Sequence, residues 1–372
     1  MWRITEKVFQ SSLVPGSFCR ASPNRRTDIM HMADALLSPA VGGTMWTATA
    51  CTIAWSARKV QADLDDRKIP LMGVLGAFIF AAQMINFTIP ATGSSGHLGG
   101  GMILAILLGP SAAFLTIASV LMVQALFFAD GGLLALGCNI FNLGVFPCFL
   151  AYPLIYLPIA GRKPTPLRIG IGATLAAMIG LQLGALGVVF ETVTSGMTEL
   201  PLTAFLSVML PIHLAIGLVE GLVTAAVVTF VWKARPEILE FTAAGRPLGR
   251  LSIGKVLAGI GLAAVVTGGA LSWFASSSPD GLEWSMLQVS GRDEPASPEQ
   301  GVHSRLAEIQ DKISFLPGYG FKTDDTAPEQ ASGSPWPAVD SGTTASGLVG
   351  GGITLVLALG LGLLFRRRNR PV

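Results

Sequence analysis

Apolar runs long enough to cross a lipid bilayer recur along this chain, and their recurrence constrains the fold more than any other feature. Hydrophobic residues make up 51% of the 372 residues and charged residues only 13%, which excludes a soluble globular fold. The sequence therefore predicts a multi-pass, all-α integral membrane protein. The apolar segments are expected at residues 40–57, 71–89, 98–109, 111–129, 132–160, 168–190, 202–232, 254–275 and 346–365.

Short clusters of basic residues beside the apolar runs predict how the chain is oriented. Basic connections lie on the cytoplasmic side of a membrane, which places residue 30 and His97 outside. The chain must then cross the membrane an odd number of times between His97, which is outside, and the basic cluster near residue 165, which is inside. A helix break at Gly109-Pro110 makes the number of crossings odd. The prediction is a seven-helix transmembrane bundle with its N-terminus outside. The clusters are Arg58, Lys59, Arg67 and Lys68; Arg162, Lys163 and Arg168; and Lys233, Arg235, Arg246 and Arg250.

The distribution of polar stretches divides the chain into modules. The predicted parts are a seven-helix module at 30–232, a cytoplasmic linker at 233–253, a two-helix module at 254–366 and a basic cytoplasmic tail at 367–372. The external loop of the second module, 276–345, is rich in Ser, Pro, Gly and acidic residues, so we expect it to be largely flexible and His303 to be solvated. Residues 1–29 lack the apolar core of a signal peptide and are interpreted as a disordered leader or a misassigned start.

The dipeptide Met30-His31 offers an unusual set of metal ligands. If the functional chain begins at Met30, its free α-amine, the His31 amide nitrogen and the His31 imidazole can close fused chelate rings on one ion. Planar nitrogen coordination suits Ni(II) or Cu(II) better than Zn(II) or Mg(II). The best candidate for a fourth donor is His97, which lies in a Gly-rich stretch between two apolar segments and on the same predicted side of the membrane.

Other polar residues are candidates for supporting roles. Each has an ordinary alternative, such as a turn for Asp130, hydrogen bonding between helices for the two asparagines, or a structural ion pair for the intramembrane residues. Those expected to support His31 or to shape the metal loops are Asp34, Ser94, Ser95, Asp130, Asn139 and Asn142, and the possible intramembrane site residues are His213 and Glu220.

Several of these motifs together resemble the substrate-capture component of nickel and cobalt energy-coupling-factor transporters over residues 30–232. The matching stretches are Met30-His31 with Asp34 and Ser38-Pro39, Gly93-Ser-Ser-Gly-His97-Leu-Gly-Gly, Ala129-Asp-Gly-Gly with Asn139 and Asn142, and Pro211-Ile-His213 with Glu220-Gly. Pro279-Asp-Gly-Leu-Glu283 resembles the small accessory subunit of the same systems, fused here over about 250–368.

The resemblance implies uptake of Ni(II) or Co(II) as transported substrate, with Met30, His31 and His97 as ligands and no organic cofactor. It further implies a multi-pass location in the cytoplasmic (inner) membrane, a transmembrane coupling subunit and cytoplasmic ATPases as partners. The chain carries no Gly-x-x-x-x-Gly-Lys-Ser/Thr motif, so ATP hydrolysis is expected on those partners rather than here.

Two other classes of function fit the sequence less well. A membrane hydrolase is disfavoured because the sequence contains no His-Glu-x-x-His motif, so we expect no enzyme activity. The basic residues sit in short clusters beside apolar runs rather than on one face, so no nucleic-acid partner is expected. A self-sufficient secondary transporter or channel for another solute remains the alternative, although no related halves with paired broken helices are evident. The types of these residues do not distinguish a nickel site from a cobalt site, but the expected planar coordination geometry favours nickel.

Overall fold

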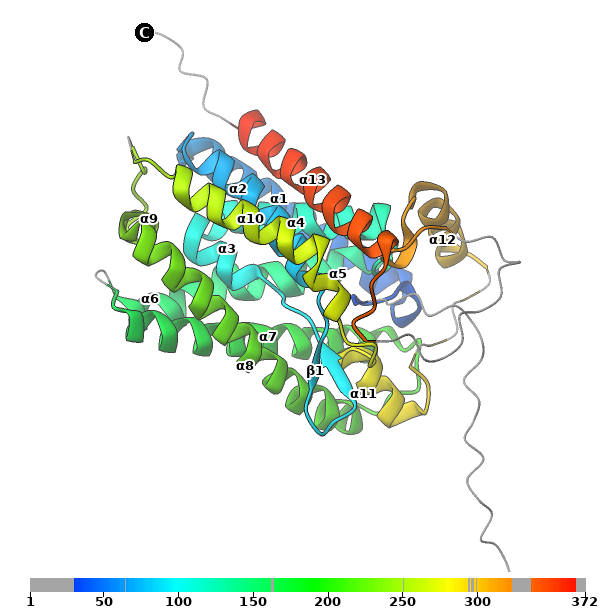
Figure 1. Cartoon of the computed structure of the whole chain (residues 1–372). Coiled ribbons are helices and arrows are strands. Elements are labelled where there is room, and N and C mark those ends of the chain that lie inside the picture. Colours follow the sequence, from blue (N-terminus) through cyan, green and yellow to red (C-terminus); the bar gives the residue numbers. More distant parts are fainter. Residues whose placement is uncertain are drawn as a thin grey trace, which may run out of the picture.

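The computed structural model describes residues 30–365, except positions 64, 162, 163, 250, 294, 296, 297, 299 and 323–335. The expected leader, the basic tail and the basic residues Arg162, Lys163 and Arg250 therefore lie outside the described residues. Figure 1 shows a bundle of helices with one short β-hairpin near the middle of the molecule.

The part of the chain before residue 235 forms a helix over every predicted apolar segment. Its elements are a short helical turn at Asp34–Leu36, α1 (Pro39–Asp63), α2 (Lys68–Gln83), β1 (Phe87–Ile89), β2 (Ser94–Gly96), α3 (Gly101–Leu108), α4 (Pro110–Phe127), α5 (Leu136–Ile140), η2 (Phe141–Tyr156), α6 (Leu157–Ala160), α7 (Pro166–Ser195) and α8 (Leu202–Ala234). Within the described residues, five helices are long and apolar enough to cross a membrane: α4, the continuous stretch Leu136–Ala160, α7, α8 and α13 (Ser341–Leu364). The prediction of a helical membrane protein is confirmed.

Proline and glycine determine where several of these helices end or widen. Gly109 has φ +84°, which glycine adopts easily, and Pro110 begins α4 where no backbone donor is needed. The chain therefore turns sharply between α3 and α4, at the predicted break. Pro147 and Pro153 lie inside η2, where the missing N–H groups favour wider π-helical turns.

The predicted apolar segment 71–89 is wrong at its C-terminal end. Helix α2 ends at Gln83, and Phe87 begins an antiparallel hairpin in which it pairs with Gly96 and Ile89 pairs with Ser94. Pro90 cannot donate a helical hydrogen bond, and the β-branched Thr88 and Ile89 favour an extended chain. The hairpin matters for the site because His97 follows it directly.

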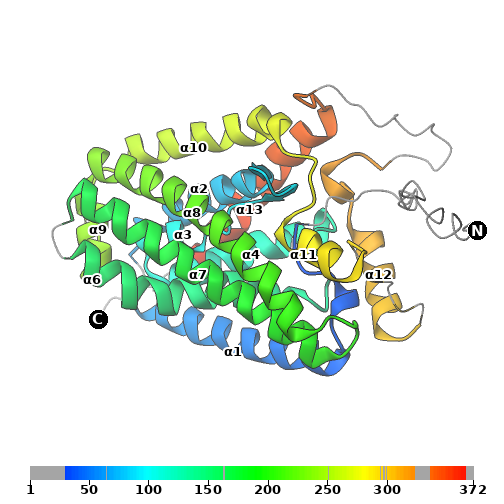
Figure 2. The ribbon, with the colours of Figure 1, turned by 90° about the horizontal axis from the view of Figure 1, so that it is seen from below.

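The second module consists of two long helices and several short ones. Helices α10 (Gly254–Gly269) and α13 both pack against α2, as Figures 1 and 2 show. Glycines allow α10 and α13 to approach closely, since a Cβ added at Gly268 would lie 3.1 Å from the carbonyl carbon of Gly347. The shorter elements of this module are η3 (Leu271–Phe274), α11 (Gly281–Ser290) and α12 (Val302–Ile313). Helix α9 (Pro236–Ala243) lies before the module, in the predicted linker, and packs against α3 and α8.

The prediction of a largely flexible external loop is wrong for its described part. Both α11 and α12 fall within it, followed by a helical turn, η4, at Pro317–Tyr319. His303 is only 6% exposed rather than solvated, and its Nε2 lies 2.8 Å from the Leu37 carbonyl oxygen. Composition predicted flexibility here, but long-range contacts with the bundle stabilise these short helices.

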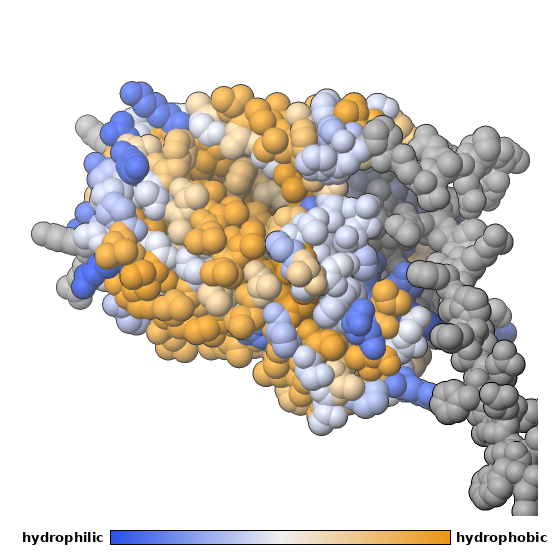
Figure 3. Space-filling model, turned by 60° about the horizontal axis from the view of Figure 1, so that its bottom comes forward, coloured by the Kyte–Doolittle hydropathy of each residue, from blue (hydrophilic) through white to orange (hydrophobic). Residues whose placement is uncertain are grey.

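The two ends of the bundle differ in character. At one end, the α1–α2 connection contacts the region after α9, where the Leu248 N–H donates to Asp65 Oδ2 over 2.6 Å. The opposite end carries α11 and α12 (Figure 2). Apolar side chains dominate the middle of the face in Figure 3, between more hydrophilic ends, as expected for a surface that meets lipid.

Candidate functional site

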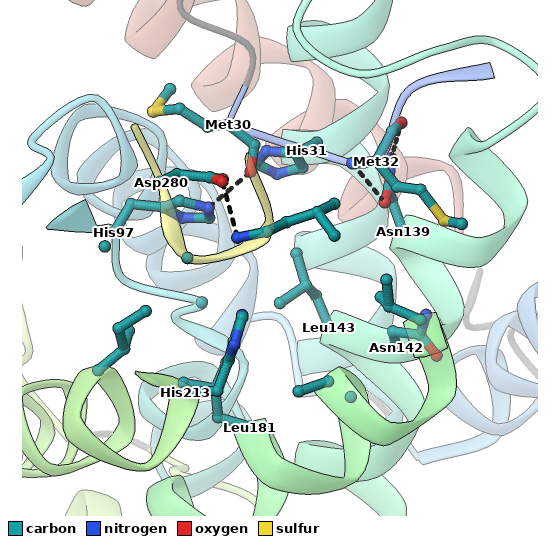
Figure 4. Close-up of a pocket in the computed structure, with 18 of the residues that line it drawn as sticks. Met30, His31, Met32, His97, Asn139, Asn142, Leu143, Leu181, His213 and Asp280 are labelled. Atoms are coloured by element: carbon teal, nitrogen blue, oxygen red, sulfur yellow. Dashed lines mark hydrogen bonds between the residues drawn. The ribbon is translucent and has the colours of Figure 1, made fainter. Parts of the chain in front are cut away.

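A small cavity lies between the start of the described chain, the loop after the hairpin, and helices η2, α7 and α8. It measures about 80 Å³, which suits an ion with a few waters. Most of its wall is apolar, including Leu143, Leu181 and Ile216. The polar residues that line it are His31, His97, Asn139, Asn142, His213 and Asp280 (Figure 4).

The segment Met30–Met32 is held in the cavity wall by its backbone. Asn139 bonds Met32 twice, accepting from its N–H over 3.2 Å and donating to its carbonyl oxygen over 3.3 Å. The Gly132 N–H donates to the same carbonyl over 3.1 Å. Both backbone groups of Met32 are therefore satisfied, which fixes the direction of the preceding His31 side chain.

Asp130 holds the other end of this segment. Its Oδ1 accepts a 2.8 Å hydrogen bond from the Met30 nitrogen. The loop turns Asp130 inward through two left-handed positions, Ala129 at φ +52° and Gly131 at φ +78°. A Cβ added at Gly131 would lie 2.8 Å from the His31 Cβ, so this position requires glycine for both conformation and space.

His31 and His97 lie side by side at the cavity. Their rings stack with centroids 5.1 Å apart and planes 10° from parallel. Both ring nitrogens of His31 are buried without a hydrogen-bond partner among the described residues, although Nδ1 lies 3.5 Å from Asp130 Oδ2. Burial lowers the pKa of His31 to about 4, with the Asp130 carboxylate opposing the shift, so the imidazole is neutral at pH 7 and its lone pair is available.

His97 is oriented by two carbonyl oxygens. Its Nδ1 lies 3.2 Å from the Leu98 oxygen and its Nε2 lies 2.8 Å from the Met30 oxygen. Both oxygens are acceptors, so the shorter contact places the N–H on Nε2, which donates to Met30. For Nε2 to bind a metal, the Met30 carbonyl must turn away and the proton must move to Nδ1, where Leu98 would accept it and anchor the ring.

The two possible intramembrane residues of α8 have separate partners. His213 points toward the cavity from the side opposite His31 and His97 (Figure 4), and its Nδ1 lies 2.8 Å from the Met209 carbonyl oxygen. Glu220 does not line the cavity; its Oε1 accepts from the Gly100 N–H over 3.0 Å, at the N-terminus of α3. Glu220 therefore anchors the loop that carries His97 and does not pair with His213.

The remaining predicted residues bind the elements around the cavity. Asp34 Oδ1 accepts from the Ala135 N–H over 2.8 Å, and Asn142 donates to Glu191 Oε2 over 2.9 Å. The hairpin serines face the second module: the Ser95 N–H donates to the Pro279 oxygen over 2.8 Å and its hydroxyl donates to the Ser278 oxygen over 2.7 Å. The Ser94 hydroxyl donates to the Ser95 carbonyl oxygen over 3.0 Å.

Sequence reasoning missed two polar residues that the second module contributes. Asp280 lines the cavity while its Oδ1 caps α11, accepting from the Leu282 and Glu283 N–H groups over 2.9 and 2.8 Å. The spacing of Asp280 and Glu283 is a capping-box pattern that predicts the start of a helix, but it does not predict a place in a cavity. Tyr319 donates to Asp130 Oδ2 over 2.6 Å, and no local pattern signals that contact.

The cavity wall carries three histidines, His31, His97 and His213, and one carboxylate, Asp280. Among the described residues, no group of three His, Cys, Asp or Glu side chains has the arrangement of a metal site. Of the predicted ligands, His31 and His97 stack ring on ring, and Met30 precedes His31 with its nitrogen bonded to Asp130. A main-chain nitrogen set of this kind fits an ion that accepts planar nitrogen ligands.

Two family models match consecutive parts of the chain. Residues 31–238 match the family model described as a cobalt uptake substrate-specific transmembrane region, and residues 254–367 match the PDGLE domain. A fused nickel transport protein of Rhodobacter capsulatus is 32% identical over 366 residues, covering 91% of this chain and 99% of that protein.

Two further relatives match more than half of the chain. A putative fused nickel transport protein of Archaeoglobus fulgidus is 35% identical over 229 residues, covering 62% of this chain and 74% of that protein. A putative metal transport protein of Haloquadratum walsbyi is 36% identical over 210 residues, covering 56% of this chain and 93% of that protein. A crystal structure titled as a truncated transition metal transporter is 30% identical, with a TM-score of 0.49 over 55% of this chain and 99% of that chain.

The first match spans more than half of the 372 residues, and the second covers the two helices α10 and α13 with the elements between them. This chain therefore belongs to the family of cobalt uptake substrate-specific transmembrane regions, and it carries a PDGLE domain fused behind that region.

Proposed function

We propose that this chain captures Ni(II) or Co(II) outside the cytoplasmic membrane and serves in its uptake as the substrate-binding component of an energy-coupling-factor transporter. The observation that carries the proposal is His31, whose two buried ring nitrogens have no hydrogen-bond partner among the described residues and which stacks on His97. Relatives named as nickel and cobalt transport proteins support the same substrate class.

The proposed ligands are the Met30 amine, the His31 amide and imidazole nitrogens, and His97 Nε2. This set requires a functional chain that begins at Met30, and the buried bond from the Met30 nitrogen to Asp130 suits a terminal amine, since a carboxylate is its natural partner. A planar set of nitrogen donors favours nickel over cobalt on geometry.

The proposed topology has seven crossings before residue 235, with Met30 outside. The crossings are α1, α2, α3, α4, the continuous helix Leu136–Ala160, α7 and α8. The described helix ends that flank the basic clusters support this orientation, because α6 and α9 lie at the end of the bundle opposite α11 and α12 (Figure 2). A transmembrane coupling subunit and cytoplasmic ATPases would then supply the driving force from the other side.

Metal binding to the purified protein tests the proposal. The chain beginning at Met30 is expected to bind one Ni(II), and His31→Ala or His97→Ala is expected to abolish stoichiometric binding, as measured by calorimetry and elemental analysis. His303→Ala is the matched control, because His303 is also buried but bonds the Leu37 oxygen away from the cavity. Unchanged binding in both test variants would refute the site.

Uptake of radioactive nickel separates the proposal from its alternative. Cells that supply the coupling subunit and ATPases should accumulate nickel through this chain, whereas cells without them should not. Accumulation in both would instead support a self-sufficient secondary transporter.

A further inference from the structure

Asp130 connects the PDGLE domain to the proposed metal ligands. Its two carboxylate oxygens serve different donors: Oδ1 accepts from the Met30 nitrogen over 2.8 Å, and Oδ2 accepts from the Tyr319 hydroxyl over 2.6 Å. Asp130 is 2% exposed and Tyr319 is 6% exposed, so water has little access to replace either bond.

Tyr319 is itself held firmly by the first module. Its ring stacks on Phe128 with centroids 5.2 Å apart, and the neighbouring Gly318 N–H donates to the Phe128 oxygen over 2.8 Å. Gln310 of α12 donates to the Ala125 and Gly131 oxygens over 2.9 and 2.7 Å, on either side of the Asp130 loop. Burial and the nearby carboxylate raise the pKa of Tyr319, so its hydroxyl remains a donor.

The second acceptor on Asp130 has a competing partner. The Nδ1 atom of His31 lies 3.5 Å from Asp130 Oδ2, too far for a good hydrogen bond but close enough to form one after a small rotation of the carboxylate. Without the Tyr319 hydroxyl, Oδ2 would be a buried acceptor lacking this donor, and His31 Nδ1 lies within reach to replace it. Such a bond would occupy Nδ1, the ring nitrogen that can close a chelate ring with the His31 amide, and would turn Oδ1 away from Met30.

We infer that Tyr319 is a positioning residue of the metal site: it keeps Asp130 directed at the Met30 nitrogen and away from His31. The inference rests on the proposed function. It assigns the PDGLE domain a direct part in metal affinity, through one hydroxyl group that reaches the site from a different module.

Tyr319→Phe tests this inference, because it removes the hydroxyl and keeps the ring that stacks on Phe128. We expect the affinity of the full chain beginning at Met30 for Ni(II) to fall about tenfold in a chelator competition. Tyr156→Phe is the matched control: Tyr156 is also buried, but its hydroxyl has no hydrogen-bond partner among the described residues. Its affinity should stay within about twofold of the unmodified chain.

Two further measurements separate positioning from a general loss of structure. The visible absorption band of bound Ni(II) should shift in Tyr319→Phe, since the amine and imidazole donors move, whereas partial unfolding would lower its intensity without moving it. In a double-mutant cycle, Tyr319→Phe should cost much less in an Asp130→Asn background, because both changes act on the same bond.

The outcomes are distinct for the two claims. If the unmodified chain binds neither Ni(II) nor Co(II), the proposed function fails. If it binds Ni(II) and Tyr319→Phe binds equally well with the same spectrum, or if the two substitutions are additive, only the role of Tyr319 is overturned.

Discussion

Asn139 provides the sharpest mutational test of how the proposed metal site is held. Its side chain makes two hydrogen bonds to the Met32 backbone, at 3.2 and 3.3 Å, and neither involves a proposed metal ligand. Asn139→Ala should therefore leave every ligand in the chain while releasing the segment that carries them.

The magnitude follows from the groups left behind. The Met32 carbonyl oxygen keeps its bond from the Gly132 N–H, so its lost bond costs about 0.5–1.5 kcal/mol. The Met32 N–H loses its acceptor in a buried place, which costs about 1–3 kcal/mol. A combined cost of about 1.5–4.5 kcal/mol, expressed entirely in binding, weakens Ni(II) affinity by about 10-fold to 2,000-fold.

Competition with a chromophoric chelator measures this change on purified protein. Thr49→Ala is the control, since Thr49 donates a buried 2.7 Å hydrogen bond to the Gly137 oxygen near the same helix and does not touch Met30–Met32. It should lower thermal stability without changing nickel affinity. A dissociation constant for Asn139→Ala within about threefold of the unmodified chain would refute the claim that docking of Met32 limits binding.

Three other substitutions test separate parts of the site. Gly131→Ala should weaken nickel binding strongly, because the new Cβ would lie 2.8 Å from the His31 Cβ. Gly196→Ala is the control: Gly196 also has a positive φ but faces open space, so the substitution should lower only stability. Equal effects of the two substitutions on nickel affinity would contradict this. Glu220→Leu should weaken nickel affinity about tenfold, because the buried Gly100 N–H loses its acceptor. Glu220→Gln keeps an acceptor oxygen, so nickel affinity measured by chelator competition should change little. His213→Ala should still bind one nickel per chain, as measured by elemental analysis. Loss of the bound nickel in this variant would show that His213 is a ligand.

The helical bundle was predictable because it depends on local composition. Long apolar runs, basic connections and the pair Gly109-Pro110 each act through neighbouring residues, and α3 and α4 divide at the predicted place. The proximity of His31 and His97 was also predictable, although 66 positions separate them, since both were expected on the same side of the membrane.

The contribution of the PDGLE domain was not predictable from local patterns. Tyr319 and Asp130 are 189 positions apart, and neither residue type predicts a contact with the other. Composition made the external stretch look flexible, whereas His303, Gln310 and Tyr319 all bond the first module. Such contacts depend on how two modules pack, which periodicity and propensity do not encode.

The central claim is that the Met30 nitrogen, as a free amine, binds the metal together with His31 and His97. It is tested most directly by comparing nickel stoichiometry for a chain that begins at Met30 with that for the same chain carrying one alanine in front of it, each N-terminus verified by mass spectrometry. The account predicts one tightly bound nickel in the first protein and loss of stoichiometric binding in the second. Equal binding in both would contradict it, because the site would then function without the amine.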